Sequence, residues 1–218
     1  MRRRALTVTI QRMKIAFLIF DKLTALDAVG PYEVFSRIPG ADVRFVGIQP
    51  GPVRTDTGAL GLQVDAALAD FADPDLLLIP GGEGNRPLMA DEAVLDWVRD
   101  VHEQSKWTTS VCTGSLVLAA AGVLKGKRAT SHWAYREELA PYGAEPVAER
   151  VVVDGKVVTA AGVSAGIDMA LHLTGLEYGE DMARAIQLGI EYDPQPPFDS
   201  GSPEKAHPDL VELVRQVA

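Results

Sequence analysis

Residues 76–84 read LLLIPGGEG, four aliphatic residues that run directly into a glycine-rich turn. A short, almost continuous apolar run is typical of a strand buried on both faces of a parallel sheet. KIAFLIF at 14–20 has the same apolar form, and WTTSV at 107–111 is strand-like with Cys112 at its C-terminal end. We therefore predict a sheet whose strand ends carry the chemistry, because sites in open parallel sheets form at the carboxyl ends of the strands.

Segments with helical patterning alternate with these strands. Residues 91–104 place apolar side chains at helical spacing with charges between them, and Asp154-Gly155 predicts a tight hairpin turn. Pro31 is predicted to stand in the first turn of a helix that runs through Ser36. The alternation predicts an α/β fold with a mainly parallel sheet. The expected strands are 14–20, 43–48, 76–79, 107–111, 129–132, 151–153 and 156–159, and the expected helices are 31–36, 91–104, 114–121, 133–139, 165–176 and 180–190. Residues 53–63 are expected to form a small hairpin, and the proline-rich residues 193–203 an extended segment that either packs as a strap or hangs free.

Composition limits the classes of protein to which the chain can belong. It has 218 residues, with 21 lysines and arginines against 30 aspartates and glutamates, and a formal net charge of −9. This acidic balance argues against nucleic acid or an anionic membrane surface as a partner. The single cysteine and four scattered histidines predict neither a disulfide framework nor a metal site.

The chain is predicted to form one domain. We interpret residues 13–218 as this domain and residues 1–12 as an N-terminal extension, either a loose tail or the product of an upstream start. No run approaches the ~20 apolar residues that span a bilayer, and the basic N-terminus lacks the apolar stretch and cleavage site of a signal peptide. We therefore expect a cytoplasmic protein.

Cys112 stands where the strand at 107–111 turns into the helix predicted from Gly114. A lone cysteine is most often an inert, buried apolar residue. At a strand-to-helix elbow, however, the side chain projects from the sheet and faces a helix N-terminus, which lowers the thiol pKa and favours the reactive thiolate. This position favours Cys112 as a nucleophile.

Two other strand ends carry groups that are expected to meet Cys112. Asp27 is interpreted equally well as a helix cap and as a carboxyl group beside the thiol, where an apolar pocket raises its pKa and lets it deliver a proton. Gly81 and Gly82 either serve a tight turn or aim backbone N–H groups at negative charge developing in the pocket, with the N–H of Thr113 as a further donor. The glycine-rich stretch lacks the pattern of a phosphate-binding loop.

Two further motifs leave alternatives open. His132 is interpreted as a base for Cys112, as a support for another residue of the site, or as a buried packing histidine. Residues 162–166 read GVSAG, which matches the G-x-S-x-G elbow of serine hydrolases. His207 is the one usable histidine downstream of Ser164, so Ser164 is better interpreted as the N-cap of the next helix.

The chain resembles the DJ-1/PfpI superfamily, and over nearly its full length it is similar to the isocyanide hydratases of that superfamily. The PGG turn and the cysteine elbow mark the superfamily, although Ser110 replaces the first glycine of the commoner G-x-C-x-G elbow. More specific are VCTGSLVLAAAG (111–122), ATSHWAY (129–135) and EYDPQPPF (191–198). The chain also resembles the amidotransferase-like half of some AraC-type regulators, but its acidic charge argues against DNA binding.

This resemblance implies a flavodoxin-like three-layer α/β sandwich, as in class I glutamine amidotransferases, and a homodimer. The implied activity is hydration of an isocyanide, R–NC, to the N-substituted formamide, with no metal or other cofactor. Glyoxalase- or deglycase-like chemistry on 2-oxoaldehydes and a non-enzymatic cysteine redox sensor are the alternatives. The implied site comprises Cys112 as nucleophile, Asp27 as its acidic partner where most relatives carry glutamate, Thr113, Gly82 and Gly81 around the nucleophile, and His132 near the cysteine.

Overall fold

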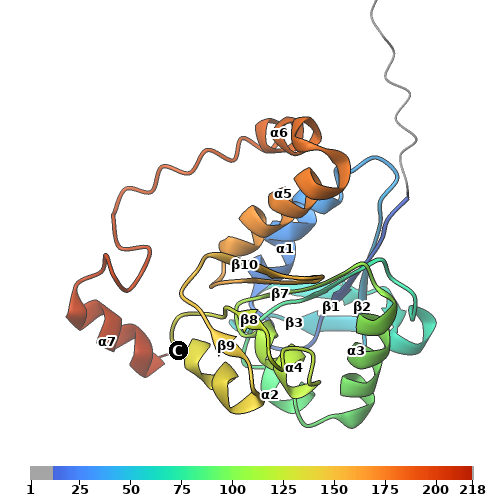
Figure 1. Ribbon diagram of the computed structural model, residues 1–218, viewed down its shortest axis with the longest axis horizontal. Helices are drawn as coiled ribbons and strands as arrows, with labels where there is room; N and C mark the ends of the chain where they lie inside the picture. Colours follow the sequence, from blue (N-terminus) through green and yellow to red (C-terminus); the bar gives the residue numbers. More distant parts are fainter. Residues whose placement is uncertain (1–11, 218) are drawn as a thin grey trace, which may run out of the picture.

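A computed structural model describes residues 12–217, and within this range seven strands form one central sheet (Figure 1). The order across the sheet is β10-β11-β7-β6-β1-β2-β5. Neighbouring strands are parallel except β10 and β11, which pair antiparallel as the predicted hairpin. The strands are β1 (Lys14–Leu18), β2 (Asp42–Gly47), β5 (Ala66–Ala67), β6 (Leu76–Ile79), β7 (Trp107–Val111), β10 (Val151–Asp154) and β11 (Val157–Ala160). The predicted mainly parallel sheet is confirmed. The N-terminal extension expected at 1–12 lies, apart from Arg12, outside the described residues.

The central strands β1, β6 and β7 bring three chain segments to one edge of the sheet. They are almost entirely buried, and their register pairs Phe17 with Leu78 and Leu78 with Thr109. Because the three strands run in the same direction, their carboxyl ends lie together. The chain leaves these ends toward α1, toward Gly81 and toward Cys112, respectively.

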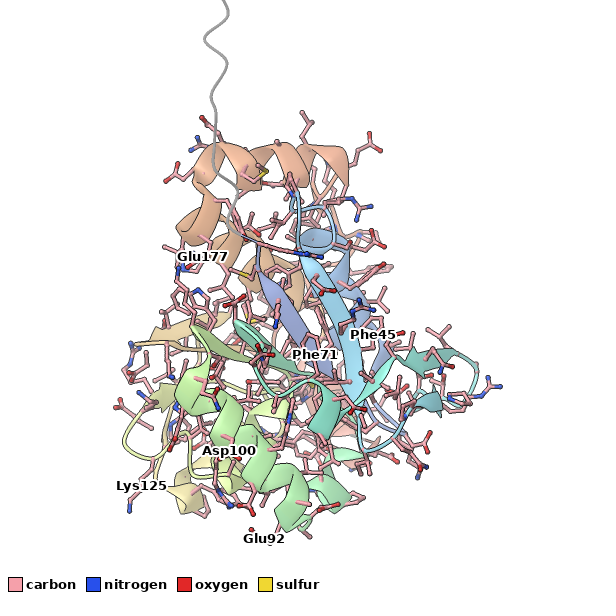
Figure 2. All side chains as sticks on the ribbon, turned by 90° about the vertical axis from the view of Figure 1, so that its right-hand side faces the viewer. Phe45, Phe71, Glu92, Asp100, Lys125 and Glu177 are labelled. Carbon is pink, nitrogen blue, oxygen red and sulfur yellow. The ribbon has the colours of Figure 1, made fainter. Side chains whose placement is uncertain are left out.

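Helices on both faces of the sheet complete three layers (Figure 1). On one face α1 packs against α5, which in turn packs against α6; on the other face α3 packs against α4. The side chain of Asp91 caps α3 by accepting the N–H groups of Ala93 and Val94, and the exposed side of this helix carries Glu92 and Asp100 (Figure 2). The helices are α1 (Ala25–Phe35), α2 (Asn85–Leu88), α3 (Glu92–Gln104), α4 (Gly114–Ala120), α5 (Ala165–Tyr178), α6 (Glu180–Gly189) and α7 (Pro208–Val217).

Pro31 lies in the interior of α1 rather than in its first turn, because the helix begins at Ala25. The prediction that the helix starts at this proline is therefore wrong. Proline cannot donate the usual helical hydrogen bond, but here its ring packs closely on α5. A Cβ atom added to Gly166 of α5 would lie 2.8 Å from the Pro31 ring, so this glycine allows the two helices to approach. The early start places Asp27 in the first turn of α1.

Smaller elements surround this framework. The predicted hairpin at 53–63 is confirmed as β3 (Gly51–Arg54) with β4 (Gly61–Val64), and β8 (Arg128–Ala129) pairs with β9 (Glu145–Pro146). The strand expected at 129–132 is thus only a two-residue pairing. The α-helix expected at 133–139 is also wrong: the chain forms a 3₁₀-helix, η2 (Arg136–Tyr142), which contains Pro141. Pro141 has no N–H to donate to the carbonyl four residues earlier, so the hydrogen bonding of an α-helix cannot be completed here. A second 3₁₀-helix is η1 (Leu68–Asp70).

After α6 the chain runs outward as a long strap and ends in α7 (Figure 1). The strap is irregular from Asp193 to Pro203, as its prolines predict, whereas α7 has no counterpart in the predicted elements. The guanidinium of Arg215 on α7 lies 5.6 Å from the ring centroid of Trp133, which is within the range of a cation–π contact. Over residues 12–217, none of the helices combines the length and the apolar character needed to cross a membrane.

Candidate active site

Cys112 occupies a sharp elbow between β7 and α4. Its φ is +57°, a left-handed conformation that is unusual for a residue with a side chain. The surroundings hold this conformation from both sides: the Cys112 N–H donates to the carbonyl oxygens of Ala160 and Ala161, at 3.0 and 3.1 Å. The Cys112 carbonyl accepts the hydroxyls of Ser115 and Ser131, at 3.1 and 3.0 Å. Local strain held in this way is typical of functional positions.

Asp27 lies next to the sulfur and is completely buried. Its side chain forms a hydrogen bond with the Cys112 side chain, and its Oδ2 accepts the N–H of Gly81 at 2.8 Å. Burial raises the pKa of Asp27 from its ordinary 3.8 to about 7, because a buried carboxylate loses its hydration. The hydrogen bonds from Gly81 and Cys112 act in the opposite direction but do not outweigh burial.

The pKa of the Cys112 thiol is raised, first by burial and then by the charge of Asp27. The N–H groups of Thr113 and Val163 both point at the sulfur and partly offset this rise. The prediction that the elbow lowers the thiol pKa is therefore wrong, because desolvation at 6% exposure outweighs the backbone donors. The two side chains titrate as a pair. When the pair holds one proton, that proton is on the sulfur in the resting site.

Gly81 and Gly82 let the three strand ends approach each other. A Cβ atom at Gly81 would lie 2.7 Å from Asp27 Oδ2 and 2.8 Å from Cys112 Cβ, so only glycine fits there. Gly82 has a φ of +129°, and its N–H donates to Thr113 Oγ1 at 3.0 Å. Both N–H groups, which we expected to face developing charge, are thus bound to side chains. The backbone donors at the sulfur are those of Thr113 and Val163.

A cavity of about 310 Å³ opens in front of the cysteine. Its wall combines apolar side chains with charged and neutral polar ones. Asp27 is not among the lining residues, so the carboxyl group lies behind the sulfur rather than in the open space. The lining residues are Thr24, Asp56, Gly82, Glu83, Asn85, Arg86, Cys112, Thr113, Leu116, His132, Tyr135 and Val163.

His132 forms part of the cavity wall but does not act on the sulfur directly. Its Nδ1 accepts the N–H of Ala134 at 3.3 Å, and burial lowers its pKa, so the ring is neutral. A Cβ atom at Gly162 would lie 2.5 Å from the ring, which shows how closely the ring packs on this glycine. The groups that contact Sγ are Asp27, Thr113 and Val163, not His132.

A second cavity, of about 420 Å³, adjoins the first. The two share His132 and Val163 as lining residues, and residues 201–204 of the strap line the second cavity from the other side. The strap thereby reaches the surroundings of the site.

The GVSAG stretch serves the cysteine rather than a serine nucleophile. Ser164 occupies the N-cap position of α5 as predicted, and its hydroxyl accepts a hydrogen bond from Arg150 at 3.2 Å. Val163 has a φ of +27°, which is strained for a β-branched residue, and its N–H donates to the sulfur of Cys112. Reasoning from the sequence missed Val163, although the G-x-S-x-G pattern did indicate a sharp turn there.

Asn85 is a second site residue that the sequence did not reveal. Its Nδ2 donates to Thr113 Oγ1 at 2.9 Å, and the side chain is almost fully buried in the cavity wall. The PGGEGN stretch gives no signal for this role beyond its position after β6. Across residues 12–217, no group of three or more histidine, cysteine, aspartate or glutamate side chains is arranged to hold a metal ion.

Known proteins resemble the chain over most of its length. The profile of the DJ-1/PfpI family matches residues 13–175. An isonitrile hydratase of Pseudomonas putida is 47% identical over 206 residues, which are 94% of this chain and 90% of that protein. The deglycase PfpI of Pyrococcus furiosus is 30% identical over 151 residues, 67% of this chain and 89% of that protein. The crystal structure of a ThiJ/PfpI family protein from Pseudomonas syringae has a TM-score of 0.92 and 37% identity, covering 95% of this chain and 86% of that one.

Proposed function

The chain belongs to the DJ-1/PfpI family, and from that membership we propose that it is an isonitrile hydratase, which adds water to an isocyanide R–NC and releases the formamide R–NH–CHO. The 47% identity to the Pseudomonas putida isonitrile hydratase, over 94% of the chain, supports this activity. The single observation that carries the mechanism is the buried carboxyl group of Asp27 beside Cys112 at the head of a cavity, where a Cβ atom on Gly81 would lie 2.7 Å from Asp27 Oδ2 and 2.8 Å from Cys112 Cβ.

In the first step the pair inserts the isocyanide into the S–H bond. The carboxylate of Asp27 takes the thiol proton, and the thiolate formed attacks the terminal carbon of R–NC. Asp27 then delivers the same proton to that carbon, which gives a thioimidate, Cys112–S–CH=N–R, and leaves Asp27 ionised. One proton on the pair suffices, and the raised pKa of Asp27, about 7, suits a group that both accepts and releases it near neutrality.

In the second step water converts the thioimidate to the formamide. The water oxygen bonds to the thioimidate carbon, and one water proton passes through the carboxylate of Asp27 to the nitrogen, so that C=N becomes C–NH. The hydroxyl proton then passes to the carboxylate of Asp27 as the carbonyl forms and the C–S bond breaks. The sulfur departs as a thiolate, and the pair regains its single proton. The N–H groups of Thr113 and Val163 support the thiolate whenever it forms.

The other site residues position this chemistry. We propose that Gly81 fixes Asp27 through its N–H and that Gly82 fixes the hydroxyl of Thr113. His132 contributes to the wall that receives the R group. The scheme requires no metal, nucleotide or redox cofactor.

Deglycase-like chemistry on a 2-oxoaldehyde, in which the same cysteine adds to the aldehyde, is the second candidate. It is favoured by the 30% identity to the Pyrococcus furiosus deglycase, which is lower and covers less of the chain than the hydratase match. The redox-sensor alternative is disfavoured because oxidants attack thiolates, whereas burial raises the pKa of the Cys112 thiol.

Parallel assays separate these candidates. Purified protein is given an aryl isocyanide and methylglyoxal in separate reactions, and formamide and loss of aldehyde are measured. We expect rapid formation of the formamide, and Cys112→Ala should abolish it while the thermal unfolding temperature changes little. Loss of methylglyoxal without formamide would contradict the hydratase proposal. If neither compound reacts but peroxide modifies Cys112 stoichiometrically, the sensor alternative is correct.

We also propose, from the resemblance, that the protein is a homodimer. Large apolar side chains on the exposed surface support this: Leu176 is 55% exposed, Leu188 77% and Phe198 78%. Light scattering coupled to size-exclusion chromatography tests the proposal, and a monomeric mass at working concentrations contradicts it. A cytoplasmic location stays a prediction from the sequence.

A further inference from the structure

The side chain of Asn85 is a buried polar group that the mechanism above does not use. It is 2% exposed and belongs to the wall of the cavity that contains Cys112. Its Nδ2 donates to Thr113 Oγ1 at 2.9 Å, but its Oδ1 is buried and has no hydrogen-bond partner among the described residues. A buried amide oxygen without a donor is costly, so this atom indicates a missing ligand.

The hydroxyl of Thr113 supplies the complementary group. Its Oγ1 accepts two hydrogen bonds, from the N–H of Gly82 at 3.0 Å and from Asn85 Nδ2 at 2.9 Å. A hydroxyl oxygen has two lone pairs, so both are occupied and the O–H hydrogen remains to be donated. No described residue accepts it. The free donor is the O–H of Thr113, and the free acceptor is Oδ1 of Asn85. One hydrogen bond joins these two side chains, and both line the cavity next to the nucleophile.

This pair matches water better than it matches the isocyanide. A water molecule both donates and accepts, so it can donate to Asn85 Oδ1 and accept the Thr113 O–H at the same time. R–NC carries no hydrogen to donate to an amide oxygen. Asp27 lies behind the sulfur and does not line the cavity, so it has no face on which to hold a water molecule before the thioimidate forms.

We propose that Asn85 and Thr113 bind the water molecule that adds to the thioimidate, a role that rests on the proposed hydratase function. Water held on this pair lies in the wall of the cavity that also contains Cys112. When the thioimidate forms, this water forms its C–O bond to the carbon attached to Sγ. Its departing proton passes to the Asp27 carboxylate, as in the second step above. Asn85 thus acts only after the cysteine has reacted.

Asn85→Leu tests this order of events, because leucine has the same branching and the same number of side-chain heavy atoms but removes both polar atoms. We expect the first-turnover rate of thioimidate formation to be unchanged, while kcat falls by about 10- to 100-fold, the loss expected for one well-placed hydrogen-bonding group. Intact-protein mass spectrometry during turnover should show Cys112 carrying the mass of one isocyanide in the variant but not in the wild type.

Ser110→Ala is the matched control. Ser110 also has a buried hydroxyl oxygen without a partner, but it lies within β7 and does not line the cavity. The Ser110→Ala variant should turn over isocyanide at the wild-type rate and accumulate no adduct on Cys112. Wild-type kcat in Asn85→Leu, or slow turnover without an accumulating adduct, overturns the proposal.

A crystal structure of the wild type gives a second test that needs neither substrate nor a stable variant. It should show an ordered water within hydrogen-bond distance of both Asn85 Oδ1 and Thr113 Oγ1, and an empty position there overturns the proposal. The two proposals fail in distinguishable ways. A wild type that does not hydrate any isocyanide refutes the hydratase function and the water site's role with it. An active wild type with an equally active Asn85→Leu variant refutes the water site alone.

Discussion

Asp27→Asn should make the protein more stable above neutral pH while it abolishes the acid–base pair. Because burial raises the pKa of Asp27 from 3.8 to about 7, the folded protein keeps this proton between those pH values, whereas the unfolded chain has lost it. The free energy of unfolding of the wild type therefore decreases as pH rises through this window. At about 1.36 kcal/mol for each pH unit, the window corresponds to about 4 kcal/mol. Asparagine keeps the shape of the side chain and does not ionise, so the variant escapes this loss.

Urea unfolding of both proteins at several pH values between 4 and 8 measures the difference. The substitution itself adds a constant difference between the two free energies of unfolding, which is measured at pH 4. By pH 8 this difference should have shifted by several kcal/mol in favour of the variant. Asp100→Asn is the control, because this carboxylate is exposed on α3, and it should follow the wild-type pH dependence (Figure 2). Parallel curves for Asp27→Asn and the wild type would refute the assignment of a buried, proton-binding carboxyl group.

Three further predictions concern turnover of isocyanide. The kcat/KM of the wild type should decrease as the pH drops below about 7, because a second proton on the pair removes the base that accepts the thiol proton. A pH profile of initial rates checks this, and a decrease that begins only near pH 4 would contradict it. Gly81→Ala should reduce turnover by about 10-fold or more and destabilise the fold by about 1–3 kcal/mol, since its methyl would lie within 2.8 Å of atoms of Asp27 and Cys112; wild-type rates and urea midpoint would refute the close contact. Ser164→Ala should retain wild-type turnover, because this hydroxyl contacts Arg150 and not the cysteine, and an inactive variant would revive the serine-hydrolase interpretation.

The sequence predicts the framework because its central strands are patterned without ambiguity. Buried parallel strands read as continuous apolar runs, as residues 14–20 and 76–79 do, and these two runs and the strand-like stretch 107–111 became the three strands that hold the site. Their shared direction was enough to predict that Asp27, Gly81 and Cys112 meet at one edge. Tertiary effects account for the errors elsewhere. The packing of Pro31 on α5 keeps this proline within a helix, and Pro141 favours a 3₁₀-helix.

The details of the site depend on burial and distance, which a sequence pattern does not contain. The helix N-terminus next to Cys112 suggested an ionised thiol, but desolvation proved the larger effect. Val163 reaches the sulfur through a backbone N–H, to which any non-proline residue type could contribute. Asn85 acts through a side chain whose neighbours come from a different strand end. Such contributions become visible only when the chain is folded.

The strap and α7 have a consequence for how such a site can diversify. They lie against Trp133 and line the second cavity, while the elbow and the paired carboxyl group are built from the sheet and the helices before them. Changes in the length or stiffness of this segment can therefore reshape the second cavity, which adjoins the first at His132 and Val163, and leave the reaction centre as it is. Substrate selectivity can therefore change through substitutions in the C-terminal segment, while the residues that hold the reaction centre stay the same.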